Sequence, residues 1–168
     1  MGVWRSLLRR GLARDAMPVI RGYRNIYDRL VLVARKSLKQ LSFADYTVHI
    51  FLLDGTEMKK LEERAGLQKQ KNHVPNVLSF PEPAGFPHPE TEVKLLGEVY
   101  LNKDLASEGF EELAYLLIHG ILHLLGYSHD KKNDILLMEE TEWKICEKIF
   151  NNAQIKNFRK CHQTSLRD

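Results

Sequence analysis

The sequence has only two cysteines among its 168 residues, and these two, Cys146 and Cys161, do not form a Cys-x-x-Cys pair. Two isolated cysteines cannot build the disulfide framework of a small secreted protein, so they indicate unpaired thiols in a reducing compartment. Long apolar runs are also missing, because no segment approaches the roughly eighteen residues that a membrane-spanning helix needs. We therefore expect a cytoplasmic protein with no membrane partner.

A global excess of charge is missing as well. The net charge is +3, and the first sixteen residues carry all of it, with four arginines against one aspartate. Because the rest of the chain is neutral, any surface that binds nucleic acid must be a local patch of basic residues.

The segment 1–16 is rich in arginine and nearly free of acids. This composition is typical of an organellar transit peptide, which would place the protein in a mitochondrion or plastid. The alternatives are a short non-native or upstream extension, with Met17 as a second candidate start. We expect the folded domain to occupy 17–152 and residues 153–168 to form a polar tail.

The remaining length suits one domain with a sizeable core. Helix-like spacing of apolar residues, or a buried helical motif, predicts helices over 23–40, 55–66, 108–125 and 133–150. Short runs rich in apolar and β-branched residues predict strands over 46–54, 77–81 and 94–102. Gly97 inside the last strand suggests a bulge. His49 lies in the first strand and reads as a surface or core histidine. We expect Leu136 and Met138 among the apolar contacts of the last helix.

Three of the seven histidines stand close together, at His119, His123 and His129. Residues four apart share one face of a helix, so His119 and His123 can chelate one divalent metal ion. Gly126 permits a tight turn that ends the helix and returns His129 toward the other two. Three nitrogen ligands leave the fourth tetrahedral position open, which is typical of catalytic zinc.

The apolar residues around these histidines predict a buried helix, and they are Ile118, Ile121, Leu122, Leu124 and Leu125. Buried imidazoles without a partner would be costly, and a metal ion supplies that partner.

One residue of the zinc-protease signature is absent from this segment. The signature His-Glu-x-x-His places a general-base glutamate directly after the first histidine, but position 120 is glycine. The histidine and glycine spacing otherwise matches the extended signature, and Met138 lies downstream. The sequence therefore keeps the ligands of a zinc peptidase or amidohydrolase without its base, which disfavours that activity.

Three separated motifs together resemble the YbeY family of zinc-dependent endoribonucleases, namely PNVLSFP at 75–81, LGEVYLN at 96–102 and HGILHLLGYSHD at 119–130. The resemblance covers about 20–150, and Met138 with Glu142 matches a pattern that follows the family's third histidine. It implies an α+β fold, in which a single small domain packs helices on a mixed β-sheet. The metal site would lie on a buried helix and the turn after it.

The resemblance also implies a function. His119, His123 and His129 would hold one zinc ion, and the protein would be an endoribonuclease that matures small-subunit ribosomal RNA and serves ribosome quality control. Its partners would be ribosomal RNA and ribosomal particles. Zinc lowers the pKa of a bound water toward about 7, which supplies a nucleophile near neutral pH. The alternative is a ribosome-associated factor whose zinc is mainly structural.

The sequence departs from the family's pattern at three places, of which the first is Val74-Pro75-Asn76, where the family often has Pro-Thr-Asp or Pro-Thr-Asn. Lys69 stands where family members carry an arginine thought to contact RNA phosphate, and lysine keeps the charge but loses the bidentate fork. A short insertion would instead give this role to Arg64. Ser128 stands where the family often has aspartate, which would remove a carboxylate that orients a ligand ring.

Overall fold

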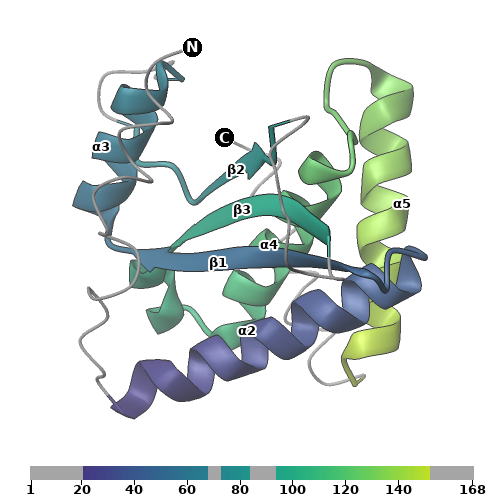
Figure 1. Ribbon diagram of the computed structural model, residues 1–168, viewed down its shortest axis with the longest axis horizontal. Helices are drawn as coiled ribbons and strands as arrows, with labels where there is room; N and C mark the ends of the chain where they lie inside the picture. The colour runs from purple at the N-terminus through teal and green to yellow at the C-terminus, as the bar shows by residue number, and fades with distance from the viewer. Residues whose placement is uncertain (1–20, 68–72, 84–93, 152–168) are drawn as a thin grey trace.

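The computed structural model describes residues 21–67, 73–83 and 94–151 (Figure 1). The predictions for residues 1–16, Lys69 and the tail 153–168 lie outside these ranges. The described elements, in chain order, are α2 (Arg21–Gln40), β1 (Tyr46–Leu53), α3 (Gly55–Ala65), β2 (Val77–Pro81), β3 (Lys94–Asn102), the 3-10 helix η1 (Lys103–Ser107), α4 (Phe110–Leu124) and α5 (Lys132–Ile149). All seven predicted helices and strands are present, and no end differs from its prediction by more than two residues.

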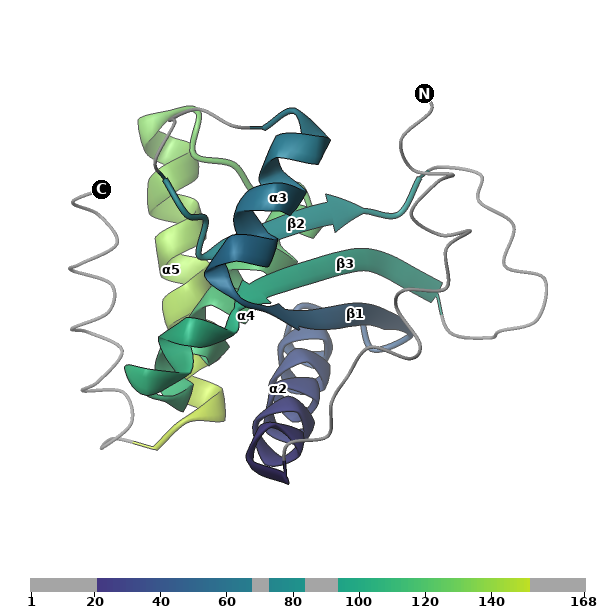
Figure 2. The ribbon, with the colours of Figure 1, turned by 90° about the vertical axis from the view of Figure 1, so that its left-hand side faces the viewer.

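The three strands form one sheet in the order β1-β3-β2. β1 runs parallel to β3 and β2 runs antiparallel to it, so the sheet is mixed and the fold is α+β, as predicted. Helices α2 and α4 cover one face of the sheet, and α5 packs against both helices (Figures 1 and 2). The core lies between these layers and includes Val48, Ile50, Val99 and Leu101 from the strands.

Local sequence explains where the elements begin and end. Asp54 caps α3, because its side chain accepts a hydrogen bond from the Glu57 backbone while the Glu57 side chain accepts one from the Asp54 backbone. Gly66 ends the same helix in the left-handed conformation. Within the described ranges no helix combines the length and the apolar character needed to cross a bilayer.

Leu136, which we expected in the core, lies on the surface of α5. We expected Leu136 to make apolar contacts, but its side chain is 54% exposed, whereas Met138 is fully buried. The two residues are two positions apart, about 200° around the helix, so they cannot face the same neighbour. His49 is exposed on β1, in agreement with its reading as a surface residue, and Cys146 is a buried free thiol.

Gly97 marks a bulge in β3, as predicted. The partner of β1 shifts there from Leu95 opposite Thr47 to Gly97 opposite Val48. Gly97 has a φ of +152°, and an added Cβ would collide with the backbone oxygen of Phe80 and lie 2.9 Å from the Cα of Pro81. β2 can therefore pair closely with β3 only because this position has no side chain.

Replacing Gly97 with alanine is expected to lower the free energy of unfolding by about 2–3 kcal/mol, because strain and a backbone collision act together. Gly66→Ala is the matched control, since Gly66 has a φ of +70° and no atom within 4 Å of its Cβ position. Urea denaturation of both variants measures the difference, and equal losses would contradict the role of the close backbone contact.

Candidate metal centre

Helix α4 carries two of the three clustered histidines. It crosses the sheet face with nearly every residue from Glu112 to Leu124 buried. His119 and His123 are its partly exposed exceptions, and they lie on one face because they are four residues apart. The rigid setting of α4 therefore fixes both imidazoles against the core.

The turn after α4 returns the third histidine to the other two. The backbone N–H of Gly126 donates to His123 O, and that of Tyr127 donates to Leu122 O, each at 3.0 Å. With Gly126 at a φ of +91°, these bonds form the Schellman motif that ends many helices. This is the turn predicted from Gly126, and it brings His129 beside His119.

The ring nitrogens converge. His119 Nε2 lies 3.0 Å from His123 Nε2 and 3.3 Å from His129 Nε2. One ring nitrogen from each of the three histidines lies within 4.8 Å of the others. A tetrahedral ion with nitrogen ligands at about 2.05 Å would hold them about 3.3 Å apart. The three rings could thus hold a metal ion with little movement.

The outer hydrogen bonds of two rings indicate what their inner nitrogens offer. His123 Nδ1 lies 3.0 Å from the carbonyl oxygen of Tyr127, and His119 Nδ1 lies 2.7 Å from a carboxylate oxygen of Glu142. Both oxygens accept, so each Nδ1 carries a hydrogen, and each ring in its neutral form turns an Nε2 lone pair inward. Two lone pairs 3.0 Å apart repel unless a proton or a cation lies between them. The donor set therefore fits a metal cation.

Electrostatics favours the neutral, metal-binding form of His123 and His129. Burial lowers the pKa of His123, and the neighbouring His119 lowers it further. Burial and His119 also lower the pKa of His129. Because metal ions bind only deprotonated imidazole, both shifts reduce competition from protons near neutral pH.

A buried acid on α5 supports this cluster. Glu142 is 2% exposed. Its Oε1 accepts from His119 Nδ1 at 2.7 Å, and its Oε2 accepts from the hydroxyl of Tyr115 at 3.0 Å. From the sequence we noted Glu142 only as part of a pattern and expected Ser128 to weaken ligand orientation. The structure instead supplies a carboxylate to His119 from α5, which is distant in sequence and packs against α4. The available signal was an acid four residues after Met138, on the apolar face of α5.

Replacing Glu142 with glutamine is expected to weaken metal binding by about 10- to 100-fold, because His119 loses its charged acceptor. Glu140→Gln is the control, since Glu140 lies on the same helix and pairs with Lys144 on the surface at 2.7 Å. Competition with a chromogenic chelator measures both affinities. If the two variants bind metal as tightly as the wild type, Glu142 does not support the site.

Gly120 faces the sheet rather than the histidine cluster. A Cβ at this position would lie 2.8 Å from Ser79 Oγ and 2.9 Å from Val99 Cγ1. Glycine therefore lets α4 approach β2 and β3 closely. The position that holds the base in zinc proteases is used here for packing, which gives a physical reason for the absence of glutamate.

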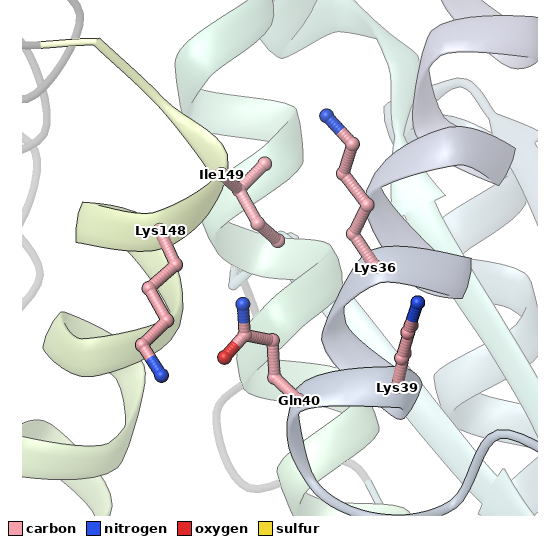
Figure 3. Close-up of a pocket in the computed structure, with 5 residues that line it drawn as sticks. All are labelled: Lys36, Lys39, Gln40, Lys148 and Ile149. Atoms are coloured by element: carbon pink, nitrogen blue, oxygen red, sulfur yellow. The ribbon is translucent and has the colours of Figure 1, made fainter.

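Of the two candidates for RNA contact, Arg64 lies within the described residues and does not join the histidine cluster. Arg64 is exposed in the last turn of α3 and makes no hydrogen bond or ion pair with the histidines. A separate hollow lies between the C-terminal ends of α2 and α5, lined by Lys36, Lys39, Gln40, Lys148 and Ile149. In Figure 3 the side chain of Lys148 points down in the view, whereas those of Lys36 and Lys39 point up, so the three ammonium groups do not meet at one point.

Comparison with known proteins decides the family. The model of the family described as Endoribonuclease YbeY matches residues 20–150. The chain belongs to the YbeY family. This confirms the resemblance drawn from the three sequence motifs.

Relatives named Endoribonuclease YbeY cover most of the same domain. The protein of Pseudomonas syringae pv. syringae (strain B728a) is 34% identical over 129 residues, which are 72% of this chain and 74% of the relative. That of Bartonella bacilliformis is 32% identical over 123 residues, or 67% and 75% of the two chains. The YbeY protein of Aquifex aeolicus is 30% identical over 112 residues, or 62% and 70%.

Proposed function

We propose that this YbeY protein is a metal-dependent endoribonuclease whose three clustered histidines, His119, His123 and His129, hold one zinc ion. The observation that carries the proposal is the convergence of three Nε2 atoms at 3.0 and 3.3 Å, with outer hydrogen bonds that aim two lone pairs inward. The name Endoribonuclease YbeY, carried by the matched relatives, supports RNA as the substrate.

Zinc is the ion that fits this donor set best. Three imidazoles and no thiolate suit a borderline ion that prefers four ligands in a tetrahedron. His129 is exposed while His119 and His123 are partly buried, so the cluster opens to solvent on one side. A bound zinc ion would supply Lewis acidity toward water and a phosphoryl oxygen. An open side favours this catalytic use over a purely structural zinc.

Residues behind the cluster orient two of the three histidine rings. Glu142 holds the ring of His119, and the carbonyl of Tyr127 holds that of His123, so both rings keep one orientation. No carboxylate stands at position 120 to act as the base of a peptidase, and the packing of Gly120 against the sheet leaves no room for one. The peptidase or amidohydrolase alternative is therefore disfavoured.

Lys69 is our candidate for contact with an RNA phosphate, and Arg64 is the alternative. Lys69→Ala is expected to lower kcat/KM on RNA by about 10-fold or more, because one charge-assisted contact to phosphate is lost, while Lys69→Arg retains activity. Single-turnover cleavage assays check this. If Arg64→Ala has the large effect and Lys69→Ala none, the role belongs to Arg64.

The substrate would be small-subunit ribosomal RNA, with ribosomal particles as partners and a role in ribosome quality control. The catalytic domain would be 17–152, flanked by the basic segment 1–16 and the tail 153–168. The location would be the cytoplasm, or a mitochondrion or plastid if the basic segment is a transit peptide.

The test of this function presents one protein preparation with two substrates, a labelled ribosomal RNA precursor and an unstructured protein. We expect cleavage of the RNA at discrete positions and an intact protein substrate. Proteolysis without RNA cleavage would overturn the proposal in favour of the peptidase alternative.

A further inference from the structure

The hydroxyl of Tyr115 stands behind the metal cluster at the end of a chain of hydrogen bonds. Tyr115 precedes His119 by one helical turn on α4, and the two rings have centroids 6.2 Å apart. Its hydroxyl donates to Glu142 Oε2 at 3.0 Å, and Glu142 Oε1 accepts from His119 Nδ1 at 2.7 Å. The two oxygens of one carboxylate therefore join Tyr115 to a candidate metal ligand.

We infer that Tyr115 is a positioning residue, which sets the affinity and geometry of the metal site through Glu142. The inference rests on the metal site of the proposed function, and it gives Tyr115 no contact with metal or substrate.

Because both groups are buried, the Glu142 carboxylate depends on the hydrogen bond from the Tyr115 hydroxyl. Tyr115 is 7% exposed and Glu142 is 2% exposed, so water does not readily replace a lost hydrogen bond at either group. A buried carboxylate is costly unless its oxygens accept hydrogen bonds, so each donor that reaches it matters. With the hydroxyl in place, Oε2 is held by Tyr115 while Oε1 faces the ring of His119. Without it, Oε2 loses this donor, and the carboxylate holds the ring of His119 less firmly in one orientation.

Two packed helices hold this chain of hydrogen bonds in place. Tyr115 and His119 are spaced on one face of α4, whereas Glu142 comes from α5. The carboxylate therefore bridges two points of α4 from the neighbouring helix, and the position of α5 is coupled to the orientation of a ligand ring. Removing the hydroxyl breaks one of these two bonds and leaves the packing of the tyrosine ring unchanged.

Tyr115→Phe tests the inference, and Tyr100→Phe is a matched control. Tyr100 also donates its hydroxyl to a partly buried glutamate, Glu98, at 2.7 Å, but it lies in the sheet on β3. Both variants lose one hydroxyl and one tyrosine–glutamate hydrogen bond. Only Tyr115→Phe is expected to weaken zinc binding, by about 10-fold, as is typical when groups behind a metal ligand are removed.

The readouts are the zinc dissociation constant without RNA, the visible spectrum of the cobalt-substituted protein, and the melting temperature of the metal-free protein. We expect Tyr115→Phe to shift the cobalt bands and Tyr100→Phe to leave them unchanged. In a Glu142→Ala background, Tyr115→Phe should have no further effect on zinc affinity, because its action passes through that carboxylate.

A Tyr115→Phe protein with wild-type zinc affinity and an unchanged cobalt spectrum would overturn the inference, even if its melting temperature falls. An additive loss in the Glu142→Ala background would overturn the route through the carboxylate. These measurements use no RNA, so a wild-type protein that binds zinc and fails to cleave RNA would refute the proposed function and leave this inference standing.

Discussion

His123→Ala is expected to abolish zinc binding and to lower RNA cleavage on the order of 1,000-fold or more. His123 Nε2 lies 3.0 Å from His119 Nε2, so this substitution removes the four-residue chelate on α4. A catalytic metal ion contributes several kcal/mol to stabilisation of a transition state, and each 1.36 kcal/mol corresponds to a tenfold change in rate. Elemental analysis of the purified protein and single-turnover cleavage give the two readouts.

His49→Ala is the control for this result. His49 is an exposed histidine on β1, and its ring contacts Phe51 rather than the cluster. We expect this variant to keep wild-type zinc content and activity. If His123→Ala keeps its metal and its activity as well, the three histidines are not the metal site.

Gly120→Glu, the substitution that would restore the zinc-protease signature, is expected to destabilise the fold and to create no protease. A side chain at this position meets Ser79 and Val99 within 3 Å of its Cβ. An overpacked core and a buried, unpaired carboxylate together lower the free energy of unfolding by about 3–5 kcal/mol. Urea denaturation and digestion of an unstructured protein measure the two effects.

Gly120→Ala separates the two causes, because it adds the Cβ without the charge. Its expected loss is about 1–3 kcal/mol. A Gly120→Glu protein with wild-type stability would contradict the close packing of α4 on the sheet. A gain of peptidase activity would show that position 120 can reach the cluster.

The parts of the site that depend on local sequence could be predicted. The spacing of His119 and His123 places them on one helical face whatever the rest of the chain does, and Gly126 marks the turn because few other residues tolerate its φ of +91°. The strands were recognisable from short apolar runs bounded by turn residues. Their order in the sheet could not be read from the same signals, because it depends on contacts between distant segments.

The hydrogen bond by which Glu142 supports the histidine cluster could not be predicted, because it also depends on a contact between distant segments. Glu142 is 23 residues from His119, and only the packing of α5 against α4 brings them to 2.7 Å. Ser128, by contrast, is adjacent to His129 in the sequence, and we therefore predicted a loss of ligand orientation from this residue. Leu136 was misplaced because it lies about 200° around α5 from Met138, and the sequence alone does not show which of these two apolar residues faces the core.

The most direct test of the central claim is cleavage of a labelled small-subunit ribosomal RNA precursor by the wild-type protein and His119→Ala, purified identically. Each is treated with a chelator, and zinc is then added back. We expect wild-type activity to disappear with the chelator and return with zinc, and the variant to be inactive throughout. Equal activity in both proteins would contradict a metallo-ribonuclease, would indicate a contaminating nuclease, and would favour a ribosome-associated factor with structural zinc.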